Sequence, residues 1–283
     1  MTETVICEET GELQSNRPGL RKPGVWSMWM FAVGLLLLAV IVTIAIPVCR
    51  RHRAIAAIER MGGGIHTRQV GYSWLRQIVG NRWIRSLETV ESVKFLGIKP
   101  LSNTDLAWLL ELPEIESLSF GNPMVDERGG RPFFHSIHHR GTPNRHPRIT
   151  DDGMRYVKEL KNLGWLSLSE TQVGDSGLEQ LAGLTKLRFL SLDLTLVTDG
   201  GLTHLCGMKN LIGLSLFRVA VTDTAIPELK CLPQLQHLYF HRVGDPEVFP
   251  GWLNEKMFDG GVGLLKRSNP RLQVHYGPGT DEF

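Results

Sequence analysis

Three histidines within residues 124–148 have the side chains and the spacing of a metal site. His135, His138 and His139 are followed by Arg140, and a helix would place residues three and four apart on one face. Imidazole nitrogens are common zinc ligands, but no Cys, Asp or Glu stands immediately beside these histidines to complete a set of four. The glycine and prolines that follow them indicate a loop instead. We therefore expect a mobile basic loop, with a metal site and contact with an acidic partner or anionic lipid as the alternatives.

A second group of histidines points to acid–base chemistry. His237 and His241 fall on the same face of a predicted strand, and Asp193 is predicted to lie two strands away on that face. An Asp–His pair needs a nucleophile to act as a hydrolase, and the sequence lacks G-x-S-x-G, Walker-type and H-E-x-x-H motifs. We therefore predict no catalytic residue, no cofactor and no enzymatic activity. A metal- or histidine-dependent enzyme remains the alternative function.

A repeat of fixed length positions these residues. Four copies of a 24-residue pattern start at Ile149, Val173, Val197 and Val221, with no insertion or deletion between them. In each copy apolar residues first recur at every third position, which is typical of one face of a short helix. They then alternate as L-x-L, which is typical of a strand that is buried on one face. Stacked copies of one helix and one strand form a solenoid with parallel strands.

The repeat continues on both sides of the four copies. Residues 101–123 match the pattern two periods upstream, and residues 257–274 restart it downstream. We therefore expect a repeat domain over residues 91–276 that is interrupted twice, by insertions at 124–148 and 245–256.

The pattern V-T-D-x-G-L-x-x-L-x-x-L-x-x-L-x-x-L-x-L resembles leucine-rich repeats of the ribonuclease-inhibitor-like and F-box type, over about two thirds of the chain. The layout of the whole chain is also similar to bacterial membrane-anchored leucine-rich-repeat proteins. The resemblance implies an α/β horseshoe, with parallel strands on the concave side and short helices on the convex side, and a role in binding proteins. No F-box segment precedes the repeats, so a ubiquitin-ligase role is not implied.

Several predicted strands carry large aromatic side chains at solvent-facing positions. These positions flank and separate the two leucines of L-x-L, and serines lie between the aromatics. Exposed apolar clusters mark partner sites, and aromatics dominate binding hot spots. The alternative is that these side chains cover one another or pack beneath an insertion. The predicted partner-binding residues of the concave face are Trp165, Phe189, Phe217, His237, Tyr239 and His241.

An acidic residue recurs at the start of each predicted helix. Asp151, Asp175, Asp199 and Asp223 occupy this column. A carboxylate just before a helix accepts hydrogen bonds from the first-turn N–H groups, and the helix dipole favours its charge. We therefore predict that these residues are N-caps rather than a ladder of metal sites. The glycines two residues later are expected to allow close packing between repeats.

The uncharged stretch from Val25 to Cys49 predicts a transmembrane helix. Its 25 residues would span roughly 37 Å, enough to cross a hydrocarbon core of ~30 Å with some tilt. Tryptophans at one end and Arg50, Arg51 and Arg53 at the other suit the two interfaces. Four or five basic residues follow the stretch and three precede it, which favours a cytoplasmic repeat domain. The same basic flank is a candidate for contact with anionic lipid.

The remaining features complete the expected organisation. The four cysteines show no spaced framework, so we expect free thiols, which suit a reducing compartment, and the net charge of +2 predicts no specific nucleic-acid binding. Residues 1–24 and 277–283 are expected to be tails, and residues 50–90 a juxtamembrane helix and an N-terminal cap, the cap itself over 65–90. The sequence thus predicts a single-pass membrane protein whose repeat domain is a protein-binding scaffold, with a structural envelope component as a further alternative.

Overall fold

The chain divides into two units, Met1–Ile46 and Pro47–Phe283. In the first, α1 (Val25–Val40) is followed by a π-helical turn, η1 (Ile41–Ala45), which leads into α2 (Ile46–Arg60). The turn has a local cause, since Pro47 cannot donate an N–H and its ring would clash with the carbonyl group four residues earlier in a regular α-helix. The computed structural model describes residues 25–68, 88–95, 99–121, 146–240 and 259–276.

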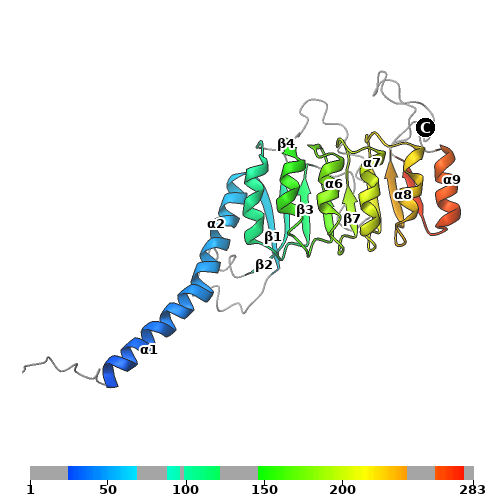
Figure 1. The fold of residues 1–283 in the computed structure, drawn as a ribbon. Coiled ribbons are helices and arrows are strands. Elements are labelled where there is room, and N and C mark those ends of the chain that lie inside the picture. Colours follow the sequence, from blue (N-terminus) through cyan, green and yellow to red (C-terminus); the bar gives the residue numbers. More distant parts are fainter. Residues whose placement is uncertain (1–24, 69–87, 96–98, 122–145, 241–258, 277–283) are drawn as a thin grey trace, which may run out of the picture. The chain divides into compact units, whose positions relative to one another are not determined.

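An eight-stranded sheet runs through the second unit in the order β1-β2-β3-β5-β7-β8-β9-β10 (Figure 1). Only the first pair, β1 with β2, is antiparallel, and every later pair is parallel. The strands are β1 (Gly63–Arg68), β2 (Thr89–Phe95), β3 (Ser117–Phe120), β5 (Trp165–Ser167), β7 (Phe189–Ser191), β8 (Gly213–Leu216), β9 (His237–Phe240) and β10 (Gln273–Tyr276). The predicted α/β architecture with a parallel sheet is confirmed.

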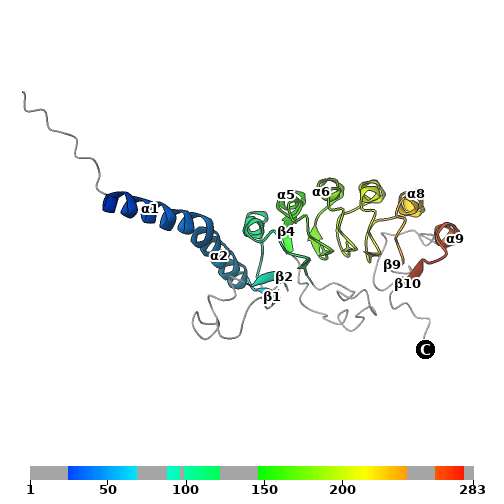
Figure 2. The ribbon, with the colours of Figure 1, turned by 90° about the horizontal axis from the view of Figure 1, so that it is seen from below.

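Short helices form a second layer against one face of this sheet (Figure 2). They are η2 (Asn103–Glu111), η4 (Asp151–Gly153), α5 (Met154–Val157), α6 (Asp175–Leu181), α7 (Asp199–Leu202), η5 (Thr203–Gly207), η6 (Asp223–Ala225), α8 (Ile226–Lys230) and α9 (Asp259–Ser268). A small second sheet pairs β4 (His146–Thr150) with β6 (Thr171–Gln172). We call the opposite face of the large sheet, the one predicted to be concave, the strand face.

The core lies between the two layers, and one row of leucines runs through it. Leu118, Leu166, Leu190, Leu214 and Leu238 pair strand to strand in register, and each is fully buried. Leu118 and Leu166 are two periods apart in sequence yet direct neighbours. The strands on either side of residues 124–148 therefore pair in the same register as the other strands.

The acidic column links neighbouring repeats and does not cap its own helices, so the N-cap prediction is wrong. Asp175 Oδ1 accepts a hydrogen bond from the backbone N–H of Thr198 in the next repeat (2.8 Å), and Asp151 Oδ1 accepts one from Gly174 N–H (2.7 Å). The N-cap of α7 is Thr198, whose hydroxyl accepts from Gly200 N–H. Each Asp lies one residue inside its helix, where its carboxylate reaches the following repeat while staying near the positive end of the helix dipole.

Glycines in the first helical turn make room for these carboxylates. A Cβ atom on Gly177 would lie 2.5 Å from Asp151 Oδ1 and 2.6 Å from Val173 Cγ1. Gly153 stands in the same relation to Asn103, whose Oδ1 would be 2.7 Å from the added atom. The glycine column therefore permits the close packing between repeats that the sequence predicts.

The first open end of the core is covered by α2. Its Ala54, Ile55 and Ile58 are buried and belong to the main core. Arg51 forms an ion pair with Glu114 and also donates to the backbone carbonyl of Glu88. The predicted cap, residues 65–90, has its central residues 69–87 outside the described part of the chain. The juxtamembrane helix thus supplies apolar cover that the sequence analysis did not assign to it.

Two of the cysteines are joined, which corrects the expectation of free thiols. Cys206 and Cys231 form a disulfide with a Cα–Cα separation of 5.3 Å. They differ by one position within the repeat, so the two cysteines do not share a column of the sequence pattern. Residues one turn of a solenoid apart are neighbours in space, and a separation of 25 residues is one period plus one.

Candidate functional site on the strand face

The strand face carries two rows of side chains that run across the strands. Ser92, Ser117, Trp165, Phe189 and Gly213 pair in register along the first row, which His237 continues. The second row, two residues further along each strand, consists of Lys94, Ser119, Ser167, Ser191, Ser215, Tyr239 and His275. Because the strand period is two, both rows point away from the leucine core.

The predicted aromatics form a cluster of their own on this face. Trp165, Phe189, Phe217 and Tyr239, which we call the aromatic cluster, are 6%, 6%, 3% and 1% exposed. The rings of Trp165 and Phe189 are stacked, with centroids 5.8 Å apart, and Phe189 and Tyr239 are 6.2 Å apart in a tilted arrangement. Gly213 provides the space for Phe189, because a Cβ atom there would collide with the phenyl ring. The side chains contact one another, and little of their surface remains open to water.

A hydrogen-bonded network of hydroxyls lies beside the aromatic cluster. Ser167 and Ser169 are 2.9 Å apart, and Ser169 and Ser191 are 2.8 Å apart. Ser191 donates to Asp193 Oδ2 (2.7 Å), and Ser215 donates to Asp193 Oδ1 (2.6 Å), which also accepts from Phe217 N–H. Asp193 is 1% exposed, and these three donors satisfy its buried oxygens. The sequence signal for this network is the column of serines that lies between the aromatic positions.

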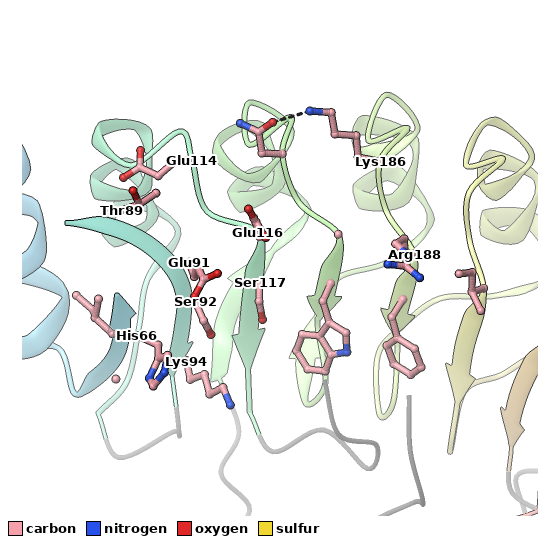
Figure 3. Close-up of a pocket in the computed structure, with 17 residues that line it drawn as sticks. His66, Thr89, Glu91, Ser92, Lys94, Glu114, Glu116, Ser117, Lys186 and Arg188 are labelled. Atoms are coloured by element: carbon pink, nitrogen blue, oxygen red, sulfur yellow. Dashed lines mark hydrogen bonds between the residues drawn. The ribbon is translucent and has the colours of Figure 1, made fainter. Parts of the chain in front are cut away.

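A groove of about 1190 Å³ opens over β1, β2, β3, β5 and β7 (Figure 3). The first row contributes Ser92, Ser117, Trp165 and Phe189 to its lining. Trp165 and Phe189 therefore bring the edge of the aromatic cluster to the groove. This is the part of the predicted concave site that borders open space.

Besides Glu114 Oε1, which is ion-paired with Arg51, three side-chain atoms of the groove are buried and have no hydrogen-bond partner within the described part of the chain. They are Ser92 Oγ, Ser117 Oγ and Trp165 Nε1, on three adjacent strands of the same row. Figure 3 shows the two serines on neighbouring strands. Buried polar groups in native proteins are nearly always hydrogen-bonded, so three in one row call for an explanation.

Both signs of charge surround these atoms. Glu91 pairs with Arg68, and Lys186 Nζ donates to Asn162 Oδ1 at 2.7 Å. Glu116 and Arg188 also line the groove and are exposed. The lining thus has no dominant charge, and it is not built to hold a polyanion.

A histidine pair closes the other end of the strand face. His237 Nδ1 lies 3.3 Å from His275 Nε2, and the His275 ring stacks on Tyr239 with centroids 4.5 Å apart. Burial lowers the pKa of His237 below its ordinary value. Burial, and then the neighbouring charge of His237, lower the pKa of His275. Both imidazoles are therefore neutral near pH 7.

The repeat period is visible directly in this geometry, since Trp165 pairs with Phe189 and Phe189 with Gly213, each 24 residues further along. Each period supplies one buried leucine strand to a parallel sheet and one helix to the layer behind it. The fold is a leucine-rich-repeat solenoid.

Comparison with known proteins gives distant structural likenesses only. No protein-family model and no curated protein matches this leucine-rich-repeat chain. Among solved structures it is similar to an internalin from Listeria monocytogenes, with 18% sequence identity and a TM-score of 0.37, over 71% of this chain and 60% of the internalin. It is also similar to a leucine-rich-repeat protein from Leptospira interrogans, with 14% identity and a TM-score of 0.36, over 68% of this chain and 50% of that protein.

The leucine-rich-repeat domain brings some of the predicted site residues together and leaves others undescribed. Trp165, Phe189, Phe217 and Tyr239 form one cluster, and His237 lies beside Tyr239. His241 and the loop candidates His135, His138, His139 and Arg140 lie outside the described residues, so the metal-site alternative stays a prediction. The sequence analysis did not include His275, because the 245–256 insertion obscures the fact that His275 and Tyr239 are paired positions on neighbouring strands.

Proposed function

We propose that this leucine-rich-repeat chain is a protein-binding module tethered to a membrane, and that its partner docks in the groove over β1 to β7. The observation that carries the proposal is the row of three buried atoms, Ser92 Oγ, Ser117 Oγ and Trp165 Nε1, that have no hydrogen-bond partner within the described residues. Leaving a buried polar group unsatisfied costs about 1–3 kcal/mol, which a ligand with matching groups recovers on binding.

The chemistry of these atoms restricts the ligand. An indole N–H only donates, so the ligand must bring an acceptor to Trp165, whereas each serine hydroxyl both donates and accepts. Backbone carbonyls and amides of a polypeptide supply both kinds of group. The mixed charges of Glu116 and Arg188 favour a protein surface over a nucleic acid or another polyanion.

Membrane attachment rests on the N-terminal helix. The helical stretch from Trp29 to Arg60 contains a segment that is long and apolar enough to cross a membrane, and none of that segment is buried in the structure. Met30 and Phe31, each 75% exposed, would be costly in water and are at home in lipid. Of the basic residues after this segment, Arg51 is engaged by Glu114, whereas Arg50 and Arg53 are exposed and available for anionic headgroups.

A site-specific photo-crosslinker tests the docking site in the full chain in its membrane. We expect a crosslinker at Arg188, an exposed residue of the groove, to give a discrete adduct with a second protein. The matched control is Lys209, which is also exposed but is not part of the groove lining.

The adduct must also depend on the unpartnered atoms. Combining Ser92→Ala with Ser117→Ala removes two of them, and should weaken the adduct at least ~10-fold. Equal adducts from Arg188 and Lys209, or an Arg188 adduct that persists unchanged in the double variant, would refute groove docking.

A further inference from the structure

Two neighbouring repeats are covalently joined behind the sheet. Cys206 lies in η5, and Cys231 follows α8 directly, as the C-cap of that helix. Both backbone segments are fixed by the core, since Leu205 is fully buried and Leu229 and Leu232 are 2% and 3% exposed. The disulfide therefore joins two positions that the fold already holds side by side.

We infer that the repeat domain occupies an oxidising compartment, on the non-cytoplasmic side of the membrane. Disulfides persist in secreted, periplasmic and cell-surface proteins, whereas cytosolic thiol reductants keep a partly exposed pair such as this one reduced. The disulfide therefore indicates the side of the membrane on which the repeats fold. This conclusion reverses the orientation that the flanking charges favour.

The placement of the rest of the chain rests on the proposed membrane anchor. With a single crossing between Val25 and Cys49, an exported repeat domain leaves residues 1–24 in the cytoplasm. Arg17, Arg21 and Lys22 are then the positively charged residues on the inner side. The basic residues that follow the helix outnumber these three by only one or two. The disulfide, in contrast, is a property of the folded repeat domain itself.

Thiol trapping in intact cells tests the inference. The full chain is expressed with Cys7→Ser and Cys49→Ser, which leaves Cys206 and Cys231 as the only cysteines. Cells are quenched with acid, free thiols are blocked with N-ethylmaleimide, and the protein is then reduced and labelled with a maleimide–polyethylene glycol. We expect a mobility shift of two labels that requires the reduction step. Two thiols blocked before reduction would overturn the inference.

A second measurement reads the orientation without using the disulfide. A variant that keeps only Cys7 is exposed to a membrane-impermeant maleimide in cells whose outer barrier, where present, has been opened. We expect Cys7 to be protected until the inner membrane is lysed, and labelling beforehand would overturn the assigned orientation. Carbonate extraction separates the two proposals, because a disulfide-bonded chain that carbonate releases would contradict the anchor and still support an oxidising compartment.

Discussion

Asp175 in one repeat holds Thr198 in the next by two hydrogen bonds. Its Oδ1 accepts from the Thr198 backbone N–H at 2.8 Å, and its Oδ2 accepts from the Thr198 hydroxyl at 2.6 Å. The same link recurs at the first junction with an amide, where Asn103 Oδ1 accepts from Thr150 N–H at 3.0 Å and Asn103 Nδ2 donates to the Thr150 hydroxyl at 2.8 Å. The chain therefore shows two chemical versions of one contact.

This comparison predicts how the junction tolerates substitution. Asp175→Ala should lower the free energy of unfolding by about 1–3 kcal/mol, because it leaves the Thr198 N–H without its acceptor. Asp175→Asn should cost much less, since an amide already fills the role at Asn103. Urea unfolding of both variants measures the difference. Equal losses would show that the charge, and not the hydrogen bond, matters here.

The glycine beside this contact makes a second prediction. Gly177→Ala places a methyl group 2.5 Å from Asp151 Oδ1, so the junction must open, at a cost of about 1–3 kcal/mol. Gly183→Ala is the matched control, because its nearest neighbour is Lys161 Nζ at 3.9 Å. Thermal unfolding should separate the two variants clearly. Similar melting temperatures would contradict a packing role for the glycine column.

The disulfide makes a third prediction. Cys206→Ser with Cys231→Ser should destabilise the domain by about 3 kcal/mol, because the cross-link closes a 25-residue loop in the unfolded chain. Stability in a repeat protein is carried by neighbouring contacts, so hydrogen exchange should rise in η5, α8 and β9 before it rises in β3. Cys49→Ser, at an exposed free cysteine, should change neither quantity.

The histidine pair makes a prediction about pH. In the unfolded chain both imidazoles titrate near 6.5, whereas their pKa values in the folded protein are lower. The unfolded state therefore binds more protons below pH 6.5, so the free energy of unfolding should be level above that pH and fall as pH drops beneath it. His275→Gln should flatten the fall between pH 7.5 and 5.5 in urea titrations. An unchanged slope would assign the effect to other groups.

The unpartnered serines of the groove make a prediction that separates binding from stability. Ser117→Ala removes a buried hydroxyl that has no hydrogen-bond partner among the described residues, so the free protein should keep or gain stability while partner binding weakens. Ser191→Ala removes a hydroxyl that is bonded to Asp193 and Ser169, and should cost about 1–3 kcal/mol of folding free energy. Destabilisation of similar size in both variants would mean that Ser117 has a structural role.

The architecture was predictable because its signal is repeated. Each leucine position occurs in every copy, so the sheet register of Leu166, Leu190 and Leu214 followed from counting. Contacts made once in the chain gave no such signal. The pairing of Cys206 with Cys231 and that of His237 with His275 each depend on a single offset between repeats.

The face of the sheet on which the aromatic side chains lie was predictable, but the way in which they pack was not. Alternation along the strands located Trp165 and Phe189 on the correct face, because the period of a strand is two. Alternation does not say whether rings on adjacent strands stand apart or stack. Gly213 makes room for the Phe189 ring and so allows the rings to stack at this position. Nothing in the sequence distinguishes this glycine from other small residues of the repeat.

The links between repeats are directional, since at four junctions the carboxylate or amide at the start of one helix accepts a hydrogen bond from the chain that enters the next helix. Asn103, Asp151, Asp175 and Asp199 each make this forward contact with backbone N–H groups, which every amino acid except proline provides. A repeat inserted between two others could form the same hydrogen bonds at both of its junctions. We therefore expect the domain to tolerate the gain or loss of whole 24-residue units, while the elements at its two ends stay as they are.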